Sequence, residues 1–311
     1  MKIHAKAGRD DVAVVYLAET GDGRMIEFAE SLQPPHPREE KWVLTISTSF
    51  GCPSGCRFCE AGGDYQGRLS FQEILFQTDY LIDARFPGKR VPVKKFKIQF
   101  ARMGEPSYNQ NVLDVLETPH ERYDAPGFIP SVSTIAPIGT DGFFRRMLEI
   151  KNRLYPERFQ LQFSIHTTDE TKRDWLIPAK KWSFSRIADF GKAFYQIGGR
   201  KVTLNFAVSP GMPVESRKLL QYFSPEIFLL KITPVNPTAS ALKNSILPFL
   251  SGADYDELAR SLKEAGYEVI LSIGEPEENL IGSNCGQYVT SYRKSDEKLS
   301  DGYTYPLQTI G

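Results

Sequence analysis

The hydrophobic residues of this chain switch repeatedly between the spacing of a strand, every second residue, and the spacing of a helix, every third or fourth. Six segments have the strand spacing: residues 43–49, 96–100, 129–134, 161–165, 202–206 and 227–232. Strands that alternate with helices form a parallel sheet with right-handed crossovers. Six such units predict an α/β fold, a partial (β/α)6 TIM-like barrel, with its functional site at the carboxyl ends of the strands.

The helices between these strands are predicted from apolar faces and capping signals. Residues 70–85 are expected to form a helix that starts at Ser70, because Glu73 completes the spacing of a capping box. Two further helical faces are formed by Phe143, Phe144, Met147 and Leu148, and by Ile187, Phe190, Phe194 and Ile197. The alternation of strand and helix therefore extends over most of the chain.

The first forty residues have a different pattern. Residues 12–17 and 25–28 flank Gly21-Asp22-Gly23, which predicts a β-hairpin, and Pro34-Pro35-His36-Pro37 predicts a rigid link after it. We therefore expect a hairpin extension at 1–40, a barrel at 41–290 and a polar tail at 291–311.

Charge and hydropathy exclude some classes of protein. The chain has 38 basic and 38 acidic residues, so it lacks the positive excess typical of nucleic-acid binding, although a local basic face is still compatible with this balance. No run of eighteen apolar residues occurs, and the first residues do not have the apolar core of a signal peptide. These features predict a cytoplasmic protein that does not contact the membrane.

Three of the four cysteines, Cys52, Cys56 and Cys59, lie together in a loop after the first predicted barrel strand. In a reducing compartment, such a cluster favours a metal site over disulfides. Structural zinc normally takes four ligands, whereas an iron-sulfur cubane held by three thiolates keeps one iron open. Two alternatives are a zinc knuckle completed by Cys285 or a histidine, and an RNA-binding module that carries zinc or a cluster.

The spacing of these cysteines and their place after a first strand resemble the radical S-adenosylmethionine superfamily. From the hairpin to about residue 287, the chain is similar to the RlmN/Cfr-type RNA methylases, which methylate carbon 2 or carbon 8 of an adenine. The matching segments are Met103-Gly104-Glu105-Pro106, Ser131-Val132-Ser133-Thr134, Ser164-Ile165-His166 and Pro234-Val235-Asn236-Pro237. The resemblance implies a 4Fe-4S cluster on Cys52, Cys56 and Cys59, and S-adenosylmethionine contacts from Gly104, Glu105, Ser133, Ser164, His166 and Asn236.

A fifth segment, Asn284-Cys285-Gly286-Gln287, resembles the family's Ala-Cys-Gly-Gln, whose cysteine is methylated during turnover. The resemblance implies that Cys285 receives a methyl group and that a radical derived from a second S-adenosylmethionine removes a hydrogen atom from it. The resulting carbon radical then adds to the adenine. Glu27 lies where the family has its base, although an exposed strand glutamate is the commoner reading of such a residue. An electron donor of the flavodoxin or ferredoxin type is also implied.

The sequence departs from the family at two places. Thr45 occupies the position of a second cysteine that frees the product, and a hydroxyl cannot replace a thiolate in thiol-disulfide chemistry. The family's N-terminal helical domain is also missing before the hairpin. We therefore expect an adenine-type substrate smaller than ribosomal RNA, in a nucleoside, a nucleotide or an RNA. The alternative is a radical enzyme of another reaction type, with Cys285 as hydrogen donor or substrate ligand.

Overall fold

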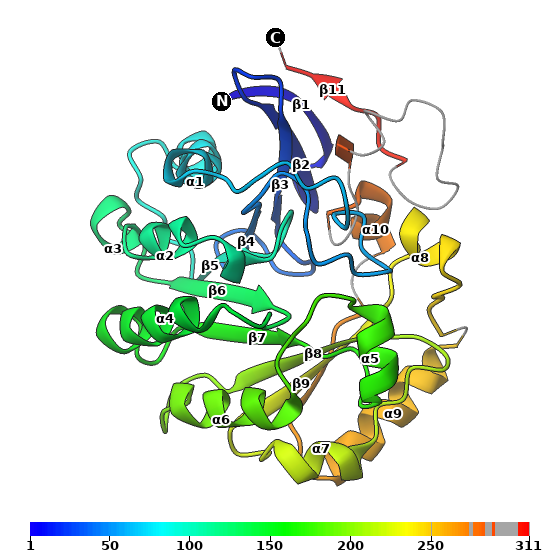
Figure 1. Ribbon diagram of the computed structural model, residues 1–311. Helices are drawn as coiled ribbons and strands as arrows, with labels where there is room; N and C mark the ends of the chain where they lie inside the picture. Colours follow the sequence, from blue (N-terminus) through cyan, green and yellow to red (C-terminus); the bar gives the residue numbers. More distant parts are fainter. Residues whose placement is uncertain (250, 274–275, 284–287, 290–303, 311) are drawn as a thin grey trace.

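The computed structural model describes residues 1–249, 251–273, 276–283, 288–289 and 304–310. Within these ranges the strands form one sheet of 11 strands in the order β10-β9-β8-β7-β6-β5-β4-β3-β2-β1-β11 (Figure 1). The strands are β1 (Lys2–Arg9), β2 (Ala13–Glu19), β3 (Met25–Ser31), β4 (Lys41–Ile46), β5 (Lys95–Phe100), β6 (Phe128–Thr134), β7 (Gln160–Ser164), β8 (Val202–Val208), β9 (Phe228–Pro234), β10 (Val269–Leu271) and β11 (Gln308–Thr309).

Strands β4 to β10 run parallel, each paired with the next. The six predicted strands correspond to β4–β9, and the predicted α/β fold with a partial TIM-like barrel is confirmed. The sequence analysis missed the seventh parallel strand, β10, because three residues are too few for an alternating pattern.

Helices follow the parallel strands along the chain. They are α1 (Phe71–Arg85), α2 (Asn111–Leu116), α3 (Pro119–Arg122), α4 (Asp141–Leu154), α5 (Glu170–Leu176), α6 (Phe184–Phe194), α7 (Ser216–Tyr222), α8 (Ala239–Lys243), α9 (Gly252–Glu264) and α10 (Pro276–Ile281), with a 3-10 turn η1 (Pro106–Tyr108). Helices α1, α2, α4 and α6 follow one another along the same side of the sheet (Figure 1).

Two predictions about helices have opposite outcomes. The capping box of α1 is present, because the Ser70 hydroxyl accepts from the Glu73 N–H and the Glu73 carboxylate accepts from the Ser70 N–H. The prediction that Ile197 belongs to the apolar face of α6 is wrong. That helix ends at Phe194, and the Ile197 side chain is 97% exposed.

The N-terminal extension contains more than a hairpin. Strands β1, β2 and β3 are antiparallel, and β3 pairs with β4 through Ala29↔Thr45 and Ser31↔Val43, so the sheet continues into the barrel. Strand β11 pairs with β1 on its other edge. Strand β1 was not predicted because its inward residues are mostly small, for example Ala5 and Ala7.

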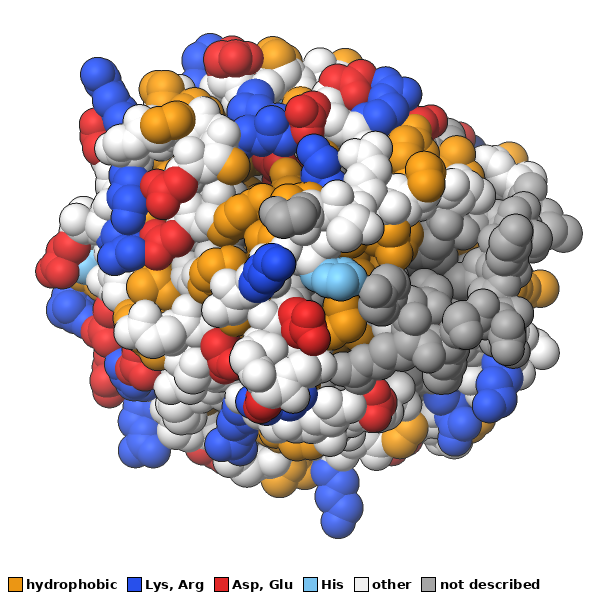
Figure 2. All heavy atoms as spheres, turned by 90° about the horizontal axis from the view of Figure 1, so that it is seen from above, with side chains coloured by type: hydrophobic (Ala, Val, Ile, Leu, Met, Phe, Trp, Pro, Cys, Tyr) orange, Lys and Arg blue, Asp and Glu red, His pale blue; other side chains and the backbone are white. Residues whose placement is uncertain are grey.

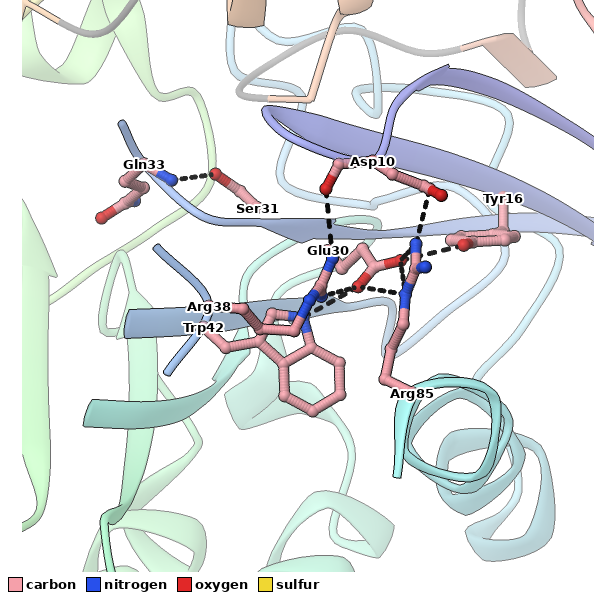
Figure 3. A network of polar contacts seen from close by, with 8 residues as sticks. All are labelled: Asp10, Tyr16, Glu30, Ser31, Gln33, Arg38, Trp42 and Arg85. Carbon is pink, nitrogen blue, oxygen red and sulfur yellow. Dashed lines mark hydrogen bonds and ion pairs between the residues drawn. The ribbon is translucent and has the colours of Figure 1, made fainter. Parts of the chain in front are cut away.

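A buried carboxylate fastens this extension to the barrel (Figure 3). Glu30 on β3 accepts hydrogen bonds from the Tyr16 hydroxyl at 2.9 Å, the Trp42 indole at 2.8 Å, and the guanidinium groups of Arg38 and Arg85, each at 2.7 Å. Burial alone would raise the pKa of Glu30, but the two arginines outweigh it and hold this pKa below its usual range. The network joins β2, β3, β4 and α1.

No helix in the described ranges is long and apolar enough to cross a membrane.

Candidate active site

A cavity of about 540 Å³ lies inside the barrel and extends to the carboxyl ends of its strands. All nine residues predicted to hold the cluster or contact S-adenosylmethionine line it: Cys52, Cys56, Cys59, Gly104, Glu105, Ser133, Ser164, His166 and Asn236. They come from segments that follow or end five different strands. The structure therefore brings together residues up to 184 positions apart in the sequence, counted from Cys52 to Asn236.

The cysteine loop is held from two sides. The Arg57 N–H donates to the Leu176 carbonyl at 2.9 Å, which ties the loop to the end of α5. On the other side, the Thr238 hydroxyl donates to the Phe58 carbonyl at 2.8 Å, and the Asn244 amide donates to the Arg57 carbonyl at 2.9 Å. The segment around α8, which follows Asn236, thus positions the cysteines.

The cysteine side chains have the chemistry that an iron-sulfur cluster requires. None of the three is part of a disulfide, and all three line the cavity. Burial raises the pKa of Cys56, and the neighbouring Cys59 and Cys52 raise it further. A bound cation reverses this effect, because thiolates are the form that ligates metal. Within the described ranges, no three His, Cys, Asp or Glu side chains are placed to hold a single metal ion, so the fit to a cluster rests on the chemistry of the three thiols.

Gly104 and Glu105 follow β5 at the same edge. Gly104 has a φ of +100°, and a Cβ at this position would lie 2.1 Å from the Ser49 Oγ, so only glycine fits here. The buried carboxylate of Glu105 accepts hydrogen bonds from the Thr134 hydroxyl at 2.5 Å and the Ile135 N–H at 2.9 Å. Burial raises the pKa of Glu105, while these donors act in the opposite direction.

His166 is held as a neutral imidazole. Burial lowers its pKa to about 3, with a smaller contribution from Arg173. Its Nδ1 accepts from the Ala207 N–H at 3.0 Å, which leaves the ring proton on Nε2. The Phe58 ring, inside the cysteine loop, lies edge-on to the imidazole with 4.8 Å between ring centres. His166 therefore connects β7 with the loop of the cysteines.

Several curated proteins are similar to this chain, although no family model matches it. The "Ribosomal RNA large subunit methyltransferase N" of Nitrosopumilus maritimus is 26% identical over 306 residues, 93% of this chain and 80% of that protein. The "Probable dual-specificity RNA methyltransferase RlmN" of Acaryochloris marina is 24% identical over 279 residues, 85% of this chain and 73% of that protein. The protein of the same name from Thermotoga petrophila is 28% identical, with coverages of 76% and 66%. The chain is a relative of the RlmN-type methyltransferases.

A solved structure agrees with this relation. The crystal structure of a radical SAM methyltransferase from Sphaerobacter thermophilus matches with a TM-score of 0.70 and 20% identity, over 92% of this chain and 80% of that one, which shows a shared fold. The resemblance predicted from the motifs, and the prediction of an enzyme of this type, are confirmed. The chain spans 66% to 80% of the length of the three RlmN-type relatives named above.

Two residues were predicted to be catalytic in this RlmN-type relative. Cys285 lies outside the described residues, and Glu27 is not among the residues that line the cavity. Glu27 is completely buried, and its Oε1 accepts from Arg102 at 2.7 Å and its Oε2 from the Val289 N–H at 3.0 Å. Burial raises the pKa of the Glu27 carboxyl, against the effect of Arg102. Its role as the base stays a prediction.

Arg102, which the sequence analysis did not single out, connects Glu27 to the cavity. Its side chain lines the cavity and donates to the Ser283 carbonyl at 2.6 Å and to the Gly282 carbonyl at 2.7 Å. The ion pair of Glu27 and Arg102 therefore holds the chain on both sides of residues 284–287, which include Cys285.

The sequence analysis also missed the polar inner face of the barrel. Gln99, Gln162, Asn205 and Lys231 line the cavity from β5, β7, β8 and β9. The buried Asn205 Oδ1 has no hydrogen-bond partner within the described residues, which is unusual unless a ligand supplies one. The sequence did contain a signal for this polar face. Strands of a parallel sheet are usually apolar on both faces, whereas the strands of this chain alternate apolar with polar residues.

Thr45, at the position of the family's second cysteine, is on the cavity wall. It lies in β4 between Ala29 of β3 and Gln99 of β5. The departure from the family at this position therefore concerns a residue that faces the site.

Proposed function

We propose that this protein is a radical S-adenosylmethionine C-methyltransferase that acts on an adenine-type heterocycle and uses Cys285 as the carbon carrier. One observation supports this most strongly: nine residues selected from motifs line a single cavity inside a barrel. RlmN-type relatives carry the name RNA methyltransferase, which supports a nucleoside, a nucleotide or RNA as the substrate.

Cys52, Cys56 and Cys59 would hold the 4Fe-4S cluster, which, when bound with S-adenosylmethionine, supplies a carbon radical. The remaining cavity residues bind and orient. Gly104 lets the backbone come close to the ligand, and the Glu105 carboxylate, anchored by Thr134, receives its ammonium group.

The neutral His166 offers an Nε2–H donor at every pH above its lowered pKa of about 3. Ser133, Ser164 and Asn236 supply further polar contacts around the same ligand. The other polar residues of the cavity wall, such as Asn205, face the space where a substrate would lie.

The methyl carbon would travel on the Cys285 sulfur, and Glu27 would accept the proton that the substrate loses. For Glu27 this requires that the proton pass Arg102, because Arg102 lines the cavity and Glu27 lies behind it. An electron donor of the flavodoxin or ferredoxin type would reduce the cluster.

The decisive experiment uses protein reconstituted with its cluster under anaerobic conditions. We expect reductive formation of 5′-deoxyadenosine and a mass increase of one methylene on the peptide that contains Cys285. Cys285→Ala should keep the first product and abolish substrate methylation. Wild-type methylation by this variant would exclude the carrier role, and absence of 5′-deoxyadenosine from the wild type would exclude the radical function.

Thr45 supports a second candidate, a radical reaction other than methylation in which Cys285 donates a hydrogen atom or binds substrate. If Cys285 carries the carbon, no cysteine faces the cavity from position 45 to release the product, so release should depend on added thiol and Thr45→Cys should accelerate it. Product formation that is independent of thiol and unchanged in Thr45→Cys would favour the second candidate.

A further inference from the structure

Lysines gather on the inner face of the barrel, away from the cysteines. Lys41 on β4 and Lys231 on β9 line the cavity. Lys97 on β5 is two residues before Gln99, another cavity residue, so both side chains lie on the inner face of the sheet. The intervening residues Phe96 and Ile98 are buried on the outer face.

These positive charges are close enough to disturb one another. Burial, followed by the positive charges of Lys231, Arg200 and Lys41, lowers the pKa of Lys97 to about 7. Burial likewise lowers the pKa of Lys41, followed by Lys231 and Lys95, and Glu278 acts in the opposite direction. Within the described residues, the side chains of Lys41 and Lys97 have neither a hydrogen bond nor an ion pair. Like charges inside a protein are costly without such partners.

Several basic residues outside the barrel, in contrast, form ion pairs with acidic residues. Lys94 pairs with Glu40 at 2.5 Å, Arg146 with Asp114 at 2.6 Å, and Arg85 with Asp10 at 2.6 Å. On the face shown in Figure 2, basic and acidic side chains are interspersed over the coloured part of the surface. These outer basic residues therefore have acidic partners, whereas the Lys41 and Lys97 side chains form no ion pair within the described residues.

The lysines lie at a distance from the cysteine loop that a second ligand could span. Lys231 is three residues before Pro234 at the end of β9, and Lys41 is five before Ile46 at the end of β4. At about 3.3 Å per residue, these separations are about 10 and about 16 Å along the strands. The cavity connects both ends, and Thr45, Gln99 and Ser133 line it between them.

We propose that the end of the cavity away from the cysteines is a subsite for a phosphate group of the substrate. Lys41, Lys97 and Lys231 would hold this phosphate, while the adenine lies nearer the cysteines. This rests on the proposed function and narrows its substrate to a nucleotide. A phosphate carries up to two negative charges and several acceptor oxygens, which matches a cluster of ammonium groups, whereas a nucleoside would leave the Lys41 and Lys97 side chains without a partner. An RNA chain would have to pass its backbone into the lumen.

The test measures binding to the cluster-loaded protein under anaerobic conditions, with S-adenosylhomocysteine present so that no turnover occurs. Adenosine monophosphate, adenosine and inorganic pyrophosphate are titrated separately. We expect the monophosphate to bind at least about tenfold more tightly than adenosine, and pyrophosphate to compete with it. Lys97→Met and Lys231→Met should each remove about tenfold of the monophosphate affinity without changing that of adenosine.

Two further variants keep the result interpretable if a methionine variant folds poorly. Lys97→Arg retains the charge and should retain the preference for the monophosphate. Lys192→Met removes an exposed lysine on the outer helix α6 and should change neither affinity.

Equal affinity for adenosine and the monophosphate in the wild type, together with no binding of pyrophosphate, would overturn this inference. So would an unchanged preference in both Lys97→Met and Lys231→Met. Failure of the proposed function looks different, because pyrophosphate would still bind in a lysine-dependent way while no methylated adenine is formed.

Discussion

The buried ion pair between Glu27 and Arg102 allows a quantitative test of how the chain around Cys285 is held. The Arg102 side chain is 2% exposed and that of Glu27 0%. Arg102→Met would leave the Glu27 carboxylate without its cation and would remove the donors of the Gly282 and Ser283 carbonyls. Breaking a buried pair on one side costs about 3 to 5 kcal/mol of unfolding free energy. At about 2 °C per kcal/mol for a chain of this size, Tm should fall by about 6 to 10 °C.

Thermal unfolding of the cluster-loaded protein measures this loss. Arg90→Met is a matched control, because Arg90 and Asp124 are 82% and 70% exposed and lie 3.5 Å apart. An exposed pair contributes less than about 1 kcal/mol, so the control should shift Tm by less than about 2 °C. The double variant Glu27→Met with Arg102→Met removes both charges and should recover part of the loss.

A drop in Tm no larger than that of Arg90→Met would refute the reasoning, as would additive effects of the two single substitutions. Glu27→Gln then separates two roles for Glu27. A base is indicated if this variant keeps its Tm and forms 5′-deoxyadenosine but no methylated product. A positioning role is indicated if Tm falls and protease cleavage within 284–287 becomes faster.

Three further outcomes are expected. Cys52→Ala, Cys56→Ala and Cys59→Ala should each lose the visible absorbance of the cluster and 5′-deoxyadenosine formation; full activity in any one of them would contradict the cluster assignment. Glu105→Ala should weaken S-adenosylmethionine binding at least about tenfold in calorimetry while cluster absorbance persists, because it removes a charge-assisted hydrogen bond worth roughly 1.5 to 3 kcal/mol; unchanged affinity would refute this role. The pKa of Lys97 falls from 10.5 to about 7 on folding, so the unfolded chain binds more protons between these values and wild-type stability should rise with pH across that window. Lys97→Met should flatten this rise, with its largest stabilisation below pH about 7, and a pH-independent difference in Tm between the two proteins would disprove the prediction.

The parts of the fold that the sequence predicted are those with strong local signals. Strands β4 to β9 alternate over several residues, and α1 begins with a complete capping box. Strand β10 was missed because it forms by pairing with β9 and has only three residues. Ile197 was misplaced because its spacing continues the apolar face of α6 after the helix has already ended.

The residues of the candidate site also fall into two groups, those that the sequence predicted and those that only the structure shows. Motifs identified Cys52, Gly104 and His166, because their chemistry is tied to neighbours in the sequence. Arg102 and Asn205 could not be found in this way, since their importance comes from contacts between distant segments, such as Arg102 with Ser283. Lys41, Lys97 and Lys231 were visible as polar residues within alternating strands, but only the three-dimensional structure shows that they are close enough to lower one another's pKa.

The attachment of β3 to β4 has a consequence for how this protein could be shortened or recombined. Residue 40 looks like a boundary in the sequence, yet the Glu30 network spans it through Trp42 and Arg85. A fragment that starts at residue 41 would expose the edge of β4 and leave the Arg85 guanidinium and the Trp42 indole N–H without their acceptor. It would also lose the part of the cavity wall formed by Ser31 and His36. The first forty residues therefore belong to the same structural unit as the cavity. When segments are exchanged between relatives, these residues and the barrel should be kept together.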